Sequence, residues 1–196
     1  FTAAEATGSI TLNNRNPVLS TAIIDNVSPQ ANDTITCSAT VSDDDGEVLS
    51  PTYAWTNGTT TLGGSATLTL SPSDAAVGDI ITCTATVADG YGGTDSTTAT
   101  ATVQNTDPTM STVSISPSSN VTISDLLTCT ATGSDVNDGS LTASYTWTNA
   151  TTGTNLGTSS TLQLDSTISS PSDLIECLVS FTDNDGGSVN DVATVT

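Results

Sequence analysis

The chain carries the same spaced trio, Cys then Trp then Cys, twice within its 196 residues. The first cysteine and the tryptophan each recur after 92 residues. A fixed period of this length is typical of a tandem array of small domains. The two trios are Cys37, Trp55 and Cys83, and Cys129, Trp147 and Cys177.

Short runs in each copy alternate apolar with polar residues, which is the period of a half-buried β-strand. No window has a convincing helical period. Strands that carry cysteines and a tryptophan in this order are typical of an immunoglobulin-like sandwich. We therefore predict an all-β fold made of two tandem immunoglobulin-like β-sandwiches with an extra N-terminal β-strand. The strands expected in the first copy are 19–24, 33–41, 52–56, 66–70, 80–88 and 97–103.

The repeat divides the chain into three predicted parts. Residues 1–15 form an N-terminal strand, residues 16–104 the first domain and residues 105–196 the second. The linker between the domains is short, and Pro108 stiffens it because its ring fixes the backbone angle φ. We expect a rod of domains rather than beads on a flexible string.

The charge balance excludes several classes of function. The chain has 21 acidic residues, a single basic residue (Arg15) and a net charge of −20. Binding of nucleic acid or of anionic membranes needs many basic residues, so neither is expected. The chain has no histidine or lysine, which excludes His-based nucleophilic catalysis and Schiff-base chemistry. We predict a protein that is not an enzyme and whose acidic surface attracts cations.

The four cysteines occur as one pair per repeat. An even count in an acidic chain rich in Thr and Ser indicates disulfides in an oxidising compartment, so we expect an extracellular or cell-surface protein. A zinc site is the alternative, but closely spaced cysteine pairs are absent. No stretch is long or apolar enough to span a membrane, and no signal peptide is present, so we interpret the chain as a mature form or an internal fragment. The predicted disulfides are Cys37–Cys83 and Cys129–Cys177.

The trios, the Tyr-x-Trp strands and the Asp-rich loops resemble the bacterial immunoglobulin-like repeats of large surface and adhesin proteins. The resemblance covers residues 16–196. Antibody domains usually carry a tyrosine two positions before the second cysteine, whereas this chain has Ile81 and Ile175 there. The resemblance implies a bacterial surface array rather than an antibody-type domain.

Residues 1–15 belong to neither complete repeat, but they look like a final strand. At an offset of 91 residues, Gly8, Ile10 and Leu12 align with Ala99, Ala101 and Val103. A lone strand exposes its apolar face and its backbone groups, so it needs a sheet to join. It closes a preceding domain of a longer array, or it is a donor strand that completes a neighbouring molecule, or it is a disordered tail. The first two alternatives give end-to-end arrays.

Each repeat has an Asp- and Gly-rich loop after each of its two cysteine strands. In an immunoglobulin-like sandwich these loops lie together at the end where the chain enters, so their oxygens converge there as Ca²⁺ requires. We predict an inter-domain calcium site in the second repeat and an equivalent site in the first. The alternative is that the loops only form turns. The predicted ligands are Asp107, Asp135, Asp138, Asp183 and Asp185, and upstream Asn16, Asp43, Asp45 and Asp89.

Five asparagines begin an Asn-x-Ser/Thr sequon and are possible glycosylation sites. Chance matches are common in a chain so rich in Ser and Thr. The five are Asn26, Asn32, Asn57, Asn120 and Asn149.

Together these patterns predict an extracellular structural protein, the subunit of a surface filament or stalk of end-to-end immunoglobulin-like domains. Its partners would be other copies of itself or neighbouring domains of a longer chain, and its only cofactor would be Ca²⁺. The alternative is an adhesin module that binds a carbohydrate or a cell-surface receptor. Such a site needs exposed aromatic side chains, and only Tyr91, Phe1 and Phe181 are not expected in a core.

Overall fold

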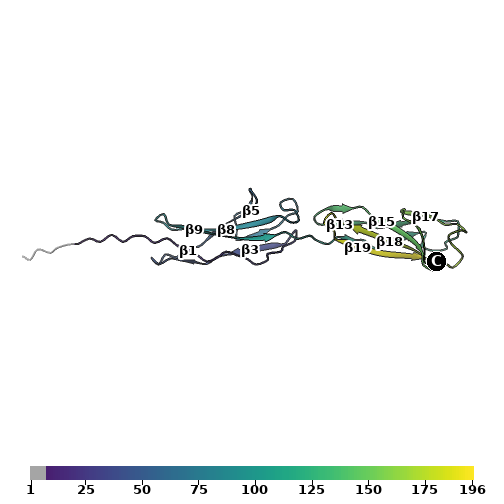
Figure 1. Cartoon of the computed structure of the whole chain (residues 1–196), viewed down its shortest axis with the longest axis horizontal. Coiled ribbons are helices and arrows are strands. Elements are labelled where there is room, and N and C mark those ends of the chain that lie inside the picture. The colour runs from purple at the N-terminus through teal and green to yellow at the C-terminus, as the bar shows by residue number, and fades with distance from the viewer. Residues whose placement is uncertain (1–7) are drawn as a thin grey trace, which may run out of the picture. The chain divides into compact units, whose positions relative to one another are not determined.

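The computed structural model describes residues 8–196, which form β-strands joined by turns and loops. The chain divides into two compact units, domain 1 up to Val103 and domain 2 from Gln104 to Thr196 (Figure 1). None of the described residues lies in a helix that could cross a membrane.

Domain 1 is a sandwich of two antiparallel sheets. Strands β2, β3 and β7 form a three-stranded sheet, and β6, β5, β8 and β9 form a four-stranded sheet in that order. Strands β1 and β4 form an additional, short antiparallel pair. The strands are β1 (Val18–Leu19), β2 (Ile23–Ile24), β3 (Thr34–Ser38), β4 (Val41–Ser42), β5 (Thr52–Asn57), β6 (Thr60–Gly63), β7 (Thr67–Thr69), β8 (Ile80–Ala88) and β9 (Thr94–Thr102).

Domain 2 repeats this arrangement. Its four-stranded sheet has the order β16-β15-β18-β19, and its three-stranded sheets are β11-β12-β17 and β10-β13-β14. The strands are β10 (Thr109–Met110), β11 (Ser114–Ser116), β12 (Leu126–Thr130), β13 (Gly133–Asp135), β14 (Gly139–Leu141), β15 (Ser144–Asn149), β16 (Thr154–Gly157), β17 (Thr161–Gln163), β18 (Ile175–Thr182) and β19 (Ser188–Val195).

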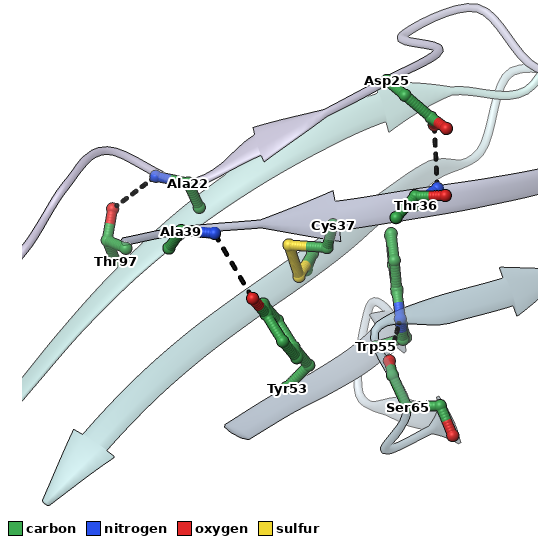
Figure 2. The surroundings of a disulfide bond; sticks show 10 residues. Ala22, Asp25, Thr36, Cys37, Ala39, Tyr53, Trp55, Ser65 and Thr97 are labelled. Atoms are coloured by element: carbon green, nitrogen blue, oxygen red, sulfur yellow. Dashed lines mark hydrogen bonds between the residues drawn. A yellow bond between two sulfur atoms is a disulfide. The ribbon is translucent and has the colours of Figure 1, made fainter. Parts of the chain in front are cut away.

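A disulfide joins the two sheets at the centre of domain 1. Cys37 on β3 bonds to Cys83 on β8, and Trp55 on β5 is fully buried near this bond (Figure 2). The indole N–H of Trp55 donates to the carbonyl of Ser65 at 2.8 Å, so its only polar atom is satisfied. Alternate residues of β8 are buried, which places its apolar side chains between the sheets.

Domain 2 has the same core. Cys129 on β12 bonds to Cys177 on β18, and Trp147 is fully buried. The Trp147 indole donates to the carbonyl of Ser159 at 2.8 Å. Both predicted disulfides are formed, and the fold prediction of two immunoglobulin-like β-sandwiches is confirmed.

The first strand predicted for domain 1, residues 19–24, is divided into β1 and β2, which pair with different partners. From the end of β1 to the start of β2, side chains of β9 accept hydrogen bonds from backbone N–H groups that would otherwise bond to a strand. The N–H of Leu19 donates to Asp95 at 2.8 Å, and the N–H of Ala22 donates to Thr97 at 3.2 Å. The sequence pattern cannot indicate such a change of partner.

The predicted N-terminal strand is not formed in the part that the structure describes. Residues 8–17 belong to no strand, and Ile10 and Leu12 are 87% and 86% exposed. The physical reason is that no sheet pairs with this segment. Residues 1–7 of the predicted strand, with Phe1, lie outside the described residues. Phe181 is only 1% exposed, so the prediction of a surface aromatic was wrong for it.

Candidate functional site

In domain 1, a short entering segment, residues 14–17, is hydrogen-bonded to both acidic loops. The Asn14 amide donates to Asp89 Oδ2 at 2.9 Å, and the N–H of Arg15 donates to Asp45 Oδ2 at 2.6 Å. Pro17, at the end of the segment, is buried. The segment is therefore attached at successive residues to the loop after β8 and the loop after β4.

Domain 2 has the same attachment 91 residues later, with residues 105–108 as its entering segment. The Asn105 amide donates to Asp183 Oδ2 at 3.0 Å, and the N–H of Thr106 donates to Asn137 Oδ1 at 3.2 Å. Pro108 is buried, as Pro17 is. Two domains with different loop sequences thus hold the incoming chain with the same pair of bonds.

The loop after the second cysteine strand is folded around its first aspartate. In domain 1, Asp89 Oδ1 accepts from the N–H groups of Tyr91 at 2.8 Å and Gly93 at 2.7 Å. In domain 2, Asp183 Oδ1 accepts from the N–H groups of Asp185 at 2.9 Å and Gly187 at 2.7 Å. An aspartate that bonds its own following backbone is the usual way for such a turn to be stabilised.

These hydrogen bonds hold both aspartates in the charged form. The Asn14 amide, followed by the N–H groups of Tyr91 and Gly93, lowers the pKa of Asp89, against a smaller opposing effect of burial. The Asn105 amide and the backbone N–H groups of the loop lower the pKa of Asp183 in the same way. Both groups are carboxylates at neutral pH, as a cation site requires.

The loop after the first cysteine strand leaves carboxylate oxygens unused. Asp43 Oδ1 accepts from the N–H of Asp45 at 2.7 Å, whereas its Oδ2 is buried without a hydrogen-bond partner. Glu47 Oε2 is also buried and has no hydrogen-bond partner. Asp135 of domain 2 repeats the pattern, because its Oδ1 accepts two backbone bonds while its Oδ2 has none.

Three carboxylates converge in domain 1. Asp43, Glu47 and Asp89 each present one oxygen, and these three oxygens lie within 4.8 Å of one another. Burial and the charges of Asp43, Asp89 and Asp45 raise the pKa of Glu47. A divalent cation would relieve this repulsion, and carboxylate oxygens are the ligands that Ca²⁺ prefers.

The predicted ligands separate into three groups. Asp43 and Asp89 meet in the cluster, and Glu47, which the prediction omitted, joins them. Its only signal in the sequence is that it is the fourth acidic residue of the Asp43–Glu47 loop. Asp135 and Asp183 are each only 7% exposed. Asp183 accepts from Asn105 of the second entering segment, whereas Asp135 is connected to that segment only through Asn137.

The remaining predicted ligands have other contacts. Asp45 accepts from the backbone of Arg15, and Asp138 accepts from both the backbone and the amide of Asn184. Asp107 and Asp185 are exposed. The Asn16 side chain lies beside Gly93, where an added Cβ would be 2.8 Å from its Oδ1.

Arg15, the only basic residue, makes an ion pair with Asp44 at 2.8 Å. Both side chains are well exposed, at 66% and 76%, so the pair adds little to stability. Because the chain has no other basic side chain, no lysine, arginine or histidine is left to neutralise the other carboxylates.

A hollow of about 330 Å³ lies beside the cluster in domain 1. Tyr91 is 76% exposed at its edge. This combination of an aromatic ring with amides and carboxylates is chemically suited to a polar ligand such as a sugar. The hollow is lined by Leu12, Asn13, Asn14, Asp45, Glu47 and Tyr91.

The structure separates the five sequons. Asn149 is 1% exposed, and its amide donates to Ile168 O at 3.2 Å and to Asp173 at 2.7 Å. The amide of Asn57 makes the equivalent bonds to Asp74 O and Asp79. Glycosylation of Asn149 is disfavoured in the folded protein, because its amide nitrogen is buried and already donates these two hydrogen bonds. The exposed sequon asparagines are Asn26, Asn32 and Asn120.

No protein-family model and no curated protein matches this sequence. Solved structures that resemble it include the three N-terminal domains of the highly immunogenic outer capsid protein of bacteriophage RB49, at 16% identity, covering 90% of this chain and 58% of that one. A calcium-stabilised adhesin with which an Antarctic bacterium binds ice is 18% identical, with 90% and 48% covered. The IG1+IG2 domains of DIP-gamma are 14% identical, with 93% and 97% covered.

All three matches have a TM-score of 0.33. The chain spans about half the length of the first two structures. These are capsid, adhesin and immunoglobulin-like proteins, and at such identities the likeness does not extend to function.

Proposed function

We propose that this chain is an extracellular structural protein, a subunit or segment of a surface filament or stalk built from immunoglobulin-like domains joined end to end. The observation that carries the proposal is the exposed apolar alternation of Gly8, Ile10 and Leu12 in front of the first entering segment. Two disulfides fit an oxidising extracellular compartment.

The position of this alternation relative to the entering segment supports a strand role. Directly before the entering segment of domain 2, the chain completes β9 of domain 1 at Thr102. Ala101 and Val103 there are 2% and 1% exposed in the core of domain 1. At the same distance before the entering segment of domain 1 stand Ile10 and Leu12. The equivalent residues therefore bury their side chains where a sheet is present and expose them where none is.

The sheet that would receive residues 8–12 is not one of those described. Domain 1 has its own last strand, β9, and domain 2 has β19 in the same place. In a longer chain, the receiving sheet belongs to another immunoglobulin-like sandwich. In a second copy, whose sheets already have their last strands, the segment adds to a sheet edge or displaces a final strand. Each arrangement joins domains in a line, as a filament or stalk requires.

Calcium is the cofactor of this proposal. Asp43, Glu47 and Asp89 converge under the entering segment, and Asn14 binds one of them directly. An ion there would neutralise the cluster and hold the incoming chain on domain 1. Terbium, a luminescent substitute for calcium, should bind close enough to Tyr91 to be sensitised by it, and Glu47→Gln should reduce that signal.

Electron microscopy with light-scattering mass tests the array. The full chain is compared with a chain that lacks residues 1–12 but keeps Asn14 and Arg15, so that the entering segment stays attached. Filaments that disappear on deletion support a strand donated between copies. Monomers in both samples mean that no second copy accepts the strand, and the filament-subunit form of the proposal is then wrong.

Point variants sharpen this test. Ile10→Asn with Leu12→Asn removes the apolar face of the segment and should abolish assembly. The control pair, Ser9→Asn with Thr11→Asn, introduces the same residue type on the opposite, polar face and should leave assembly intact. Equal effects from both pairs would contradict a role for the apolar face.

A second candidate function is an adhesin module for a carbohydrate, favoured by the exposed Tyr91 beside the hollow in domain 1. Aromatic rings stack on the apolar faces of sugars, and carboxylates and amides accept or donate to their hydroxyl groups. Glycan-array binding that Tyr91→Ala abolishes would support this function. Unchanged glycan binding in that variant would place the sugar elsewhere.

A further inference from the structure

One buried carboxylate oxygen in domain 2 has no hydrogen-bond donor. Asp135 is only 7% exposed, and its Oδ1 accepts from the N–H groups of Asn137 at 2.6 Å and Asp138 at 3.0 Å. Its Oδ2 is buried without a partner. A buried charge with an unused oxygen is unfavourable, and a bound cation is one way to satisfy it.

A second unused oxygen lies in the same region. Thr106 Oγ1 is buried without a hydrogen-bond partner, while the N–H of Thr106 donates to Asn137 at 3.2 Å. Asn137 in turn donates its own N–H to Asp135. Thr106 and Asp135 are therefore linked through one intervening residue. The neighbouring Asn105 binds Asp183, which is also 7% exposed.

We infer that domain 2 holds a second divalent-cation site under its entering segment, with Asp135 Oδ2 and Thr106 Oγ1 as ligands and the Asp183 carboxylate in support. The choice of Ca²⁺ as the ion rests on the calcium proposed for domain 1. The donors are all hard oxygens, and the chain has no histidine and no free cysteine in the described residues, which disfavours softer transition metals.

The position of this site follows from the internal repeat. Asp135 and Asp183 occupy the same places in domain 2 as Asp43 and Asp89 in domain 1, where oxygens of those two residues and Glu47 lie within 4.8 Å of one another. In both domains the first aspartate of the earlier loop leaves its Oδ2 unused. The ion would thus occupy the same structural position twice.

The two sites should differ in strength. Glu47 of domain 1 is replaced by Gly139 at the equivalent position of domain 2, and Asp138 is already bonded to Asn184. The second site therefore has fewer free carboxylates than the first. Sites of this kind in extracellular modules bind Ca²⁺ with a Kd of about 10⁻⁴–10⁻³ M, and the second site should lie at the weak end of that range.

Isothermal titration of the full chain with CaCl₂, after removal of metal with EDTA, tests the inference. The wild type should bind two ions, and Asp135→Asn should bind one. Thr106→Val keeps the backbone bond to Asn137 and the shape of the side chain, and it should weaken the second ion several-fold. Asp191→Asn removes one exposed charge from β19 and serves as the control, which should still bind two ions.

The part of the terbium luminescence that Tyr91→Phe removes reports on domain 1 and separates the two proposals. If Asp135→Asn loses one ion and keeps the terbium signal, the second site is supported. If wild type and Asp135→Asn bind the same number of ions, or Thr106→Val has wild-type affinity, the second site is overturned. The domain 1 site is then judged separately, by whether the terbium signal of Tyr91 is present. Unfolding curves in EDTA establish that each variant is folded.

Discussion

At the scale of single residues, Gly93 is a position where one added carbon would meet two close neighbours. A Cβ there would contact Asp89 Oδ2 and would lie 3.0 Å from the backbone Cα of Asn16. We expect Gly93→Ala to destabilise domain 1 by about 1–3 kcal/mol, as overpacking usually does. Gly90→Ala in the same loop has no atom within 4 Å of its Cβ and should change stability by less than about 0.5 kcal/mol. Urea unfolding of both variants measures the difference, and equal stabilities would contradict the close contact.

Asp25 makes the stability of domain 1 depend on pH. Its carboxylate accepts from the N–H of Thr36 at 2.8 Å (Figure 2), and this backbone bond is the main reason that the pKa of Asp25 is lowered. A lowered pKa in the folded state means that the carboxylate stabilises the fold above its ordinary pKa, and that this contribution is lost as the pH falls through the lowered value.

We therefore expect Asp25→Asn to lower the melting temperature of domain 1 at pH 7. Between about pH 4 and pH 2, the melting temperature of this variant should fall less than that of the wild type. Thermal unfolding followed across this pH range measures both effects. Asp74→Asn removes an exposed charge of the same kind and serves as the control. Parallel pH profiles for wild type and Asp25→Asn would show that the Thr36 bond has no such role.

At the scale of elements, each disulfide connects strands of opposite sheets across 46 or 48 residues. In the chain-entropy model, a loop of this length stabilises the folded domain by about 4 kcal/mol. Replacing Cys37 and Cys83 by alanine should unfold domain 1 at a much lower temperature while domain 2 keeps its transition. Differential scanning calorimetry measures both transitions, and the variant that lacks Cys129 and Cys177 should give the reverse result. A single shared loss in both variants would contradict independent cores.

The strands also mark where sequence pattern and pairing diverge. The alternation of residue types on β8 and β18 predicts their buried faces correctly. Both are central strands that pair along both edges, so their backbones stay regular and every second side chain points into the core. Residues 19–24 were predicted as one strand, yet the chain from Val18 to Ile24 pairs first with β4 and then with β3. Alternation reports which face is apolar and contains no information about which strand supplies the hydrogen bonds.

At the scale of the whole molecule, the net charge of −20 opposes any contact between copies. Salt screens such repulsion over about 8 Å at physiological ionic strength and over shorter distances at higher salt. If copies join through residues 8–12, the light-scattering mass should rise between 10 and 500 mM NaCl. The chain without residues 1–12 should stay monomeric throughout. A mass that falls with salt would instead indicate association driven by charge.

The repeat of Cys, Trp and Cys was enough to predict two disulfide-bonded sandwiches, because a buried tryptophan, an inter-sheet disulfide and strand alternation each restrict the fold independently. The acidic loops were recognisable as candidate cation sites because residue type and spacing can be read directly from the sequence. Only the tertiary structure decided which oxygens meet.

In the folded protein, Glu47 lies beside Asp43 and Asp89, and Asp45 and Asp138 are used in hydrogen bonds to the backbone. Asp135 is buried with one carboxylate oxygen that has no hydrogen-bond partner. These outcomes depend on contacts between segments far apart in the sequence. Such contacts are set by how the loops pack on the entering segment rather than by any single stretch of residues.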